Sequence, residues 1–175
     1  MSINLQELLR QAVQMEIDGR EYYSKVAQST RNPLARHTFE TLAREEDRHR
    51  SYFEAYYAAA AAGEGLPAME EVGVEAVNRV ARAETVFARA SAEVGEVFVE
   101  ADLPDAYAHA MEMERRTIEF YQGLRDKLEA EAVRQFLDFI VDQERQHLEL
   151  LSRSLDVVNE PEAWFFDEER WVVEG

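Results

Sequence analysis

Two short motifs of the form Glu-x-x-His could hold metal ions. In the first, Glu46 stands three residues before His49, and in the second, Glu144 stands three residues before His147. Three residues along an α-helix make almost one turn, so the carboxylate and the imidazole of each motif project from the same helical face. Each motif therefore offers an oxygen and a nitrogen to one metal ion.

The two motifs belong to a repeat with an offset of 98 residues, from His49 to His147. The same offset relates Glu16 to Glu114 on two other predicted helices. Two helices would then carry one glutamate each, and two would carry a glutamate and a histidine each. This pattern predicts a set of six metal ligands: Glu16, Glu46, His49, Glu114, Glu144 and His147.

A structural interpretation of these residues has to be weighed against the metal site. An isolated glutamate on an inner helical face is more often a boundary residue than a ligand, and one Glu-x-x-His can arise by chance in a chain with 36 acidic residues. Repetition favours the metal site, because the two motifs use two of only four histidines. Both motifs also lie on otherwise apolar stripes, where a lone charge is costly.

The charges of the six residues indicate which ion would fit. Four carboxylates inside a bundle repel one another unless positive charge balances them. The predicted inner stripes carry no basic residue near the site, since Arg20 and Arg44 lie beside them. Two divalent cations would balance the four charges, and oxygen-rich ligation with one nitrogen per metal suits iron or manganese better than structural zinc or copper. Two bridging glutamates would hold such metals about 3.5–4 Å apart.

Two tyrosines are candidate catalytic groups. Tyr23 and Tyr121 lie seven residues after Glu16 and Glu114 and share their predicted helical faces. Their hydroxyl groups could hydrogen-bond the metal ligands or a bound peroxide. Aromatic core residues whose hydroxyls are satisfied locally would give the same pattern.

The composition restricts the class of protein. The chain has 175 residues, 46% of them hydrophobic and 31% charged, which suits one soluble globular domain. Its net charge of −17 would repel nucleic acid and anionic lipid, so neither is expected as a partner. The absence of cysteine excludes disulfides, thiolate catalysis and iron–sulfur clusters. The sequence has no recognisable secretory signal or apolar run of about 18 residues, so a cytoplasmic location is expected.

Helical periodicity and turn residues divide the chain into two hairpins. The first hairpin is expected over about residues 4–62 and the second over about 104–158. A connector at about 64–103 must travel the length of the bundle, and the aromatic, acidic tail at 159–175 is expected to pack on the bundle or on a partner subunit. Two repeated hairpins joined by a long crossover predict an all-α four-helix bundle, in a single domain over residues 1–175.

The ligand pattern and its surroundings resemble the di-iron domain of rubrerythrins, in the ferritin-like superfamily. The resemblance lies in residues 15–23, 45–49 and 113–121 and extends over the four bundle helices. It implies a ferritin-like fold with two iron ions. The glutamates of the Glu-x-x-His motifs would bridge or chelate the metals, each histidine would bind one metal, and the two remaining glutamates would be ligands from single helices.

Two features depart from the rubrerythrin pattern. Rubrerythrins usually carry a cysteine-bound, rubredoxin-like iron centre, and a chain without cysteine must take its electrons from an external donor. A further carboxylate is also expected one turn from Glu114, where this chain has Met111 and Thr117, while Glu112 should point away. These differences favour a site of the symmetric oxidase or ferroxidase type.

The expected function is that of a carboxylate-bridged dinuclear iron protein, a peroxidase- or ferroxidase-type oxidoreductase that reduces hydrogen peroxide or O2 in oxidative stress. Its expected partners are peroxide or O2, an external electron donor and further copies of itself, in a homodimer or small homo-oligomer. The alternatives are an iron-binding or storage protein, a dimanganese catalase-like enzyme, a mixed-metal site, and a purely structural bundle.

Overall fold

The computed structural model describes residues 4–74, 86–88, 90 and 102–160. Four long helices account for most of these residues: α1 (Leu5–Ser29), α2 (Pro33–Ala62), α4 (Leu103–Arg125) and α5 (Glu131–Asn159). The described part of the chain contains no β-strand, and the predicted all-α fold class is confirmed.

Local capping and turn residues begin and end α2. Asn32 is its N-cap, where the side-chain oxygen accepts a hydrogen bond from the backbone N–H of Ala35 at 3.0 Å, and Pro33 is the first helical residue. At the other end, Gly63 adopts a left-handed conformation with φ 71°, which a residue without a Cβ adopts without strain. Local sequence chemistry therefore fixes the length of α2.

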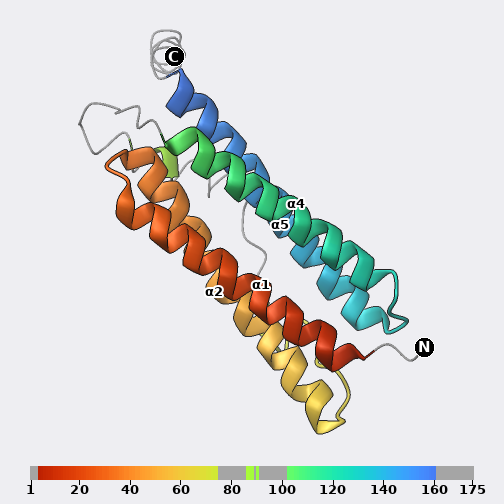
Figure 1. Ribbon diagram of the computed structural model, residues 1–175. Helices are drawn as coiled ribbons and strands as arrows, with labels where there is room; N and C mark the ends of the chain where they lie inside the picture. Colours follow the sequence, from red (N-terminus) through yellow and green to blue (C-terminus); the bar gives the residue numbers. More distant parts are fainter. Residues whose placement is uncertain (1–3, 75–85, 89, 91–101, 161–175) are drawn as a thin grey trace, which may run out of the picture.

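The four helices form two antiparallel hairpins, α1 with α2 and α4 with α5 (Figure 1). Across the bundle α2 faces α5 and α1 faces α4. Since α2 and α4 run in the same direction, the chain between them has to return along the bundle, as in a ferritin-like fold. Most of this connector and the tail at 161–175 lie outside the described residues.

Two apolar clusters fill the bundle, one toward each end. The first is centred on residues such as Phe39, Tyr107 and Leu151, and the second on residues such as Phe53 and Phe136. Each helix contributes to both clusters, and each carries its predicted ligands between these contributions. The fold therefore places one polar layer in the middle of an otherwise apolar core.

The described parts of the connector touch both ends. Leu66, Met69 and Val72 pack against the second cluster, whereas Val86 belongs to the first cluster and Phe87 packs against it. The described residues of the connector therefore contact the clusters at both ends of the bundle. Among the helices described, none combines the length and the apolar character needed to cross a bilayer.

Candidate metal centre

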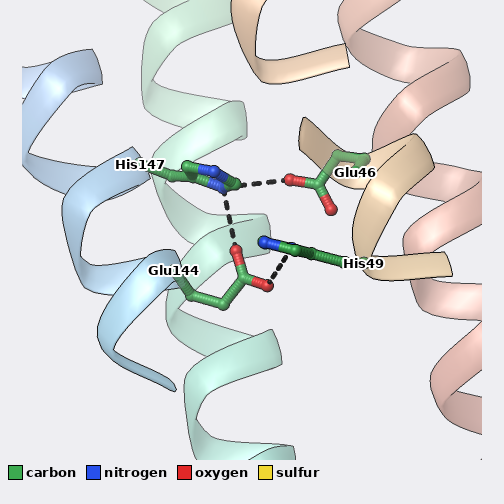
Figure 2. A group of neighbouring side chains, drawn as sticks. All are labelled: Glu46, His49, Glu144 and His147. Carbon is green, nitrogen blue, oxygen red and sulfur yellow. Dashed lines mark ion pairs between the residues drawn. The ribbon is translucent and has the colours of Figure 1, made fainter. Parts of the chain in front are cut away.

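The centre of the polar layer is formed by the two Glu-x-x-His motifs, which face each other from α2 and α5 (Figure 2). Glu46, His49, Glu144 and His147 are all buried, and one potential ligand atom from each lies within 4.8 Å of the others. The one-turn spacing within each helix and the packing of α2 on α5 together produce this cluster.

The contacts in the cluster repeat across the two hairpins. Nδ1 of His49 lies 3.0 Å from a carboxylate oxygen of Glu144, and Nδ1 of His147 lies 3.0 Å from a carboxylate oxygen of Glu46. The 98-residue offset exchanges these two pairs, so the internal repeat of the sequence becomes a pseudo-twofold arrangement in space. Nδ1 of His147 also lies 2.9 Å from the second oxygen of Glu144, so the Glu144 carboxylate faces both imidazoles.

Glu16 of α1 and Glu114 of α4 stand at the sides of this cluster. A carboxylate oxygen of Glu16 is 3.6 Å from Nδ1 of His49, and one of Glu114 is 3.4 Å from Nδ1 of His147. The structure therefore gathers all six residues that the sequence predicts as ligands, with Glu16 and Glu114 outside the tight four-residue group.

The two candidate tyrosines hold these outer glutamates. The hydroxyl of Tyr23 on α1 donates a hydrogen bond of 2.5 Å to Glu114 on α4. In the reciprocal contact, the hydroxyl of Tyr121 on α4 donates to Glu16 on α1. Each tyrosine thus fixes a carboxylate on the opposite helix, and a catalytic role for either one stays a prediction.

Burial and mutual repulsion act on the carboxyl groups of the site. Burial, with the charges of Glu144 and Glu16, raises the pKa of Glu46 well above its usual range. Burial also raises the pKa of Glu114, to about 7, because the favourable charge of His147 offsets it only in part. For Glu144 the balance is reversed: burial opposes ionisation, but the imidazoles of His49 and His147 hold its pKa below the usual range.

The neighbouring carboxylates in turn raise the pKa values of the two imidazoles. Burial would lower the pKa of His49, but the neighbouring Glu144 and Glu16 carboxylates outweigh it and raise the pKa to about 9. The charges of Glu144 and Glu114 likewise raise the pKa of His147 well above its usual value, against the effect of burial. Without a metal, protonated imidazoles thus supply the positive charge between the carboxylates.

Six polar atoms of the site form no hydrogen bond within the described part of the chain, although all are buried: Glu16 Oε2, Glu46 Oε1, His49 Nδ1, Glu144 Oε1, Glu144 Oε2 and His147 Nδ1. Buried polar atoms without a hydrogen bond are uncommon, and several that converge on one point require an explanation. Carboxylate oxygens and imidazole nitrogens are ligands for iron and manganese. The residues present therefore fit a pair of divalent metal ions.

Sequence reasoning missed one buried charged residue next to the centre. Glu45 is only 4% exposed, and one of its oxygens lies 2.9 Å from Nε2 of His147. Its other oxygen forms an ion pair of 3.2 Å with Arg48. The available signal was the three-residue spacing of Glu45 and Arg48, which marks a helical ion pair but does not show that it reaches into the core.

The expected departure around Glu114 also has a structural counterpart. Met111 packs against the first apolar cluster. Glu112 is exposed and pairs with Arg116 at 2.9 Å, so it points away from the site, as the sequence predicted. On this stretch of α4, Glu114 is the carboxylate that reaches the centre.

Two hairpins with a crossover connection and a Glu/His layer define a ferritin-like bundle with a candidate di-metal site. The family model for Rubrerythrin matches residues 7–155, and the chain belongs to the rubrerythrin family. An uncharacterized protein of Archaeoglobus fulgidus is 43% identical over 49 residues, which cover 28% of this chain and 76% of that protein. No solved structure gives a significant match.

Proposed function

We propose that this protein holds two iron ions and uses them to reduce hydrogen peroxide or O2, with electrons from an external donor. The observation that carries the proposal is the convergence of buried oxygen and nitrogen atoms from both hairpins on one point of the core, where none of them forms a hydrogen bond. Membership of the rubrerythrin family supports the same reading.

The contacts suggest how the six residues would share two metals. Glu144 presents one oxygen to each imidazole, so its carboxylate would offer a ligand atom to both metals. Glu46 is its counterpart from the other hairpin. His49 and His147 would each bind one metal through Nδ1.

The two outer glutamates, Glu16 and Glu114, would bind the metals from the sides. Tyr121 holds the first of them and Tyr23 the second by a hydrogen bond.

Two divalent metal ions would balance the charges of this layer. Four carboxylates carry four negative charges when ionised, and two divalent cations would neutralise them while the imidazoles are neutral. Two bound ferrous ions would supply the two electrons that cleavage of a peroxide O–O bond requires. The protein groups keep bulk water out, since the six side chains are at most 4% exposed, and they fix the geometry of the ligands.

Two tyrosine hydroxyls stand next to the carboxylates and could hold or move protons. Burial and the nearby charges of Glu114 and Glu46 raise the pKa of Tyr23 well above its usual value. Burial and the charge of Glu16 likewise raise the pKa of Tyr121 well above its usual value. Both hydroxyls therefore stay protonated at neutral pH and act as hydrogen-bond donors.

The decisive experiment loads the metal-free protein with Fe2+ under anaerobic conditions and mixes it with peroxide or O2 in a stopped-flow instrument. We expect two irons per chain and oxidation of two ferrous ions per peroxide. Glu144→Ala should lose most of the bound iron, whereas Glu149→Gln, an exposed position on the same helix, should not. Unchanged iron content in Glu46→Ala and Glu144→Ala would identify a purely structural bundle and refute the proposal.

The same preparation separates the other candidates. A hollow assembly of many subunits with far more than two irons per chain would indicate storage, whereas a dimer or small oligomer by gel filtration agrees with redox catalysis. Manganese in the purified protein, with peroxide converted to O2 without added reductant, would indicate a catalase-like site. Either result would replace the proposed reaction.

A further inference from the structure

The two halves of the centre differ at one position next to the histidines. His147 has Glu45 beside its Nε2 atom, at 2.9 Å. The 98-residue offset places Gln143 at the position equivalent to Glu45, so a neutral amide takes the place of a carboxylate in the other half. Both residues are buried. The repeat is therefore symmetric in its six candidate ligands and asymmetric at the residue that precedes each Glu-x-x-His motif.

The ion pair behind Glu45 is also specific to one half. Arg48 lies 3.2 Å from the second oxygen of Glu45, and both residues line a surface hollow over α1 and α2. The offset relates Arg48 to Gln146, whose side-chain amide donates to Asp142 at 2.7 Å. Arg48 stabilises the negative charge of Glu45, so this residue acts as a carboxylate and accepts hydrogen bonds.

The carboxylate of Glu45 next to Nε2 determines which ring nitrogen of His147 carries the hydrogen. An ionised carboxylate has no proton to donate, so Nε2 must carry the hydrogen and donate it to Glu45. The lone pair of a neutral ring then lies on Nδ1, which faces Glu46, Glu114 and Glu144. A hydrogen bond from a metal-binding imidazole to a carboxylate also makes the ring a stronger electron donor.

We propose that Glu45 is a positioning residue that fixes His147 with Nδ1 toward the metal centre, so that the half of the centre containing His147 binds a divalent metal more tightly than the half containing His49. This inference rests on the proposed function, because it concerns the metals that the six ligands would hold. The pair fills in order, and the two metals differ in electronic character although their ligand sets match.

The first test is a titration of the metal-free protein with Co2+, whose visible absorption reports binding to each site. The wild type should show two phases of different affinity. Glu45→Gln keeps the size of the side chain and removes its charge, and it should weaken the tighter phase by about 10–100-fold while it leaves the other phase unchanged. Glu54→Gln is the matched control, because Glu54 also pairs with an arginine of α2, at 2.6 Å, but is exposed. It should change neither phase.

The second test detects the proposed hydrogen bond directly and begins with the wild-type protein. NMR of 15N-histidine-labelled wild-type protein should show a ring Nε2–H of His147 that exchanges slowly with water, since this ring is fully buried. The signal should be present both without metal and with diamagnetic Zn2+, and in Glu45→Gln it should move upfield. Absence of this N–H, or two cobalt phases that Glu45→Gln leaves unchanged, would overturn the inference. Failure of the wild type to bind any metal would instead refute the proposed function, and the N–H signal separates the two cases.

Discussion

At the scale of single residues, burial and charge act against each other on the six side chains of the centre. The carboxylates around His49 and His147 raise the pKa values of both imidazoles, although burial alone would lower them. Metal ligation needs the lone pair on Nδ1, so an imidazolium must lose a proton first. Protons and metal ions therefore compete for the same atoms.

Metal binding should consequently release protons at neutral pH. His49, with a pKa of about 9, is protonated in the metal-free protein at pH 7, and Glu114, with a pKa of about 7, is partly protonated. Metal affinity should rise with pH up to about 9, roughly tenfold per pH unit for each proton displaced. Calorimetric titration with Mn2+ in buffers of different ionisation enthalpy counts these protons. An affinity that falls with pH, or no proton release, would contradict this account.

At the scale of the helices, close packing of α1 on α2 helps to place Glu46. Gly19 of α1 is buried, and a Cβ at this position would lie 3.4 Å from Cγ and Cδ of Glu46. That distance is ordinary van der Waals contact, so a methyl group fits but a larger side chain would displace the carboxylate. The small residue on α1 leaves the space that Glu46 of α2 occupies.

A small and a large substitution at this glycine should affect the protein differently, the first through its stability and the second through its metal affinity. Gly19→Ala should stabilise the protein by about 0.5–1 kcal/mol, because alanine loses less backbone entropy in a helix than glycine does. Gly19→Leu should push Glu46 aside and weaken metal binding at least about tenfold. Gly123→Ala on α4 is the control, since nothing lies within 4 Å of its Cβ position, and it tests the helical gain alone. Thermal unfolding and metal titration of each variant measure both effects, and loss of metal in Gly19→Ala would refute the packing argument.

The helix caps allow a second test at this scale. The side chain of Asn32 accepts from Ala35 N at 3.0 Å and is fully buried, whereas Asn4 accepts from Glu7 N at 3.3 Å and is exposed. Asn32→Ala should cost about 1–2 kcal/mol, and Asn4→Ala about 0.5 kcal/mol, because only the first leaves a buried N–H without its partner. Urea unfolding of both variants makes the comparison, and equal losses would show that burial of the cap is unimportant.

At the scale of the whole molecule, the centre is a layer of charge between two apolar clusters that hold the hairpins together. Ionised carboxylates in that layer oppose folding unless cations balance them. A metal that binds only the folded chain therefore couples ligation to global stability.

Removal of metal should lower the melting temperature of the protein. A metal ion at about one hundred times its dissociation constant stabilises the folded state by about 2.7 kcal/mol. For a chain of this size, that corresponds to a rise in Tm of roughly 5–10 °C. Scanning calorimetry before and after chelation measures the change. Glu144→Gln should show little difference between the two conditions, and a wild type that melts at the same temperature in both would contradict the coupling.

The sequence by itself determined the elements and the candidate ligand set. The helix ends at Asn32, Pro33 and Gly63 depend on local backbone chemistry, which the chain carries wherever it folds. The one-turn spacing of Glu46 and His49, and its repetition 98 residues later, depend only on helical periodicity. These properties act over a few residues, so they could be predicted without coordinates.

Only the tertiary structure decided which atoms meet. The crossed hydrogen bonds of Tyr23 and Tyr121, the shared carboxylate of Glu144 and the contact of Glu45 with His147 all join different helices. Helical periodicity gives the face from which a side chain projects. The orientation of an imidazole, and the choice of its nitrogen for a metal, depend on the charges that a neighbouring helix brings within hydrogen-bonding distance.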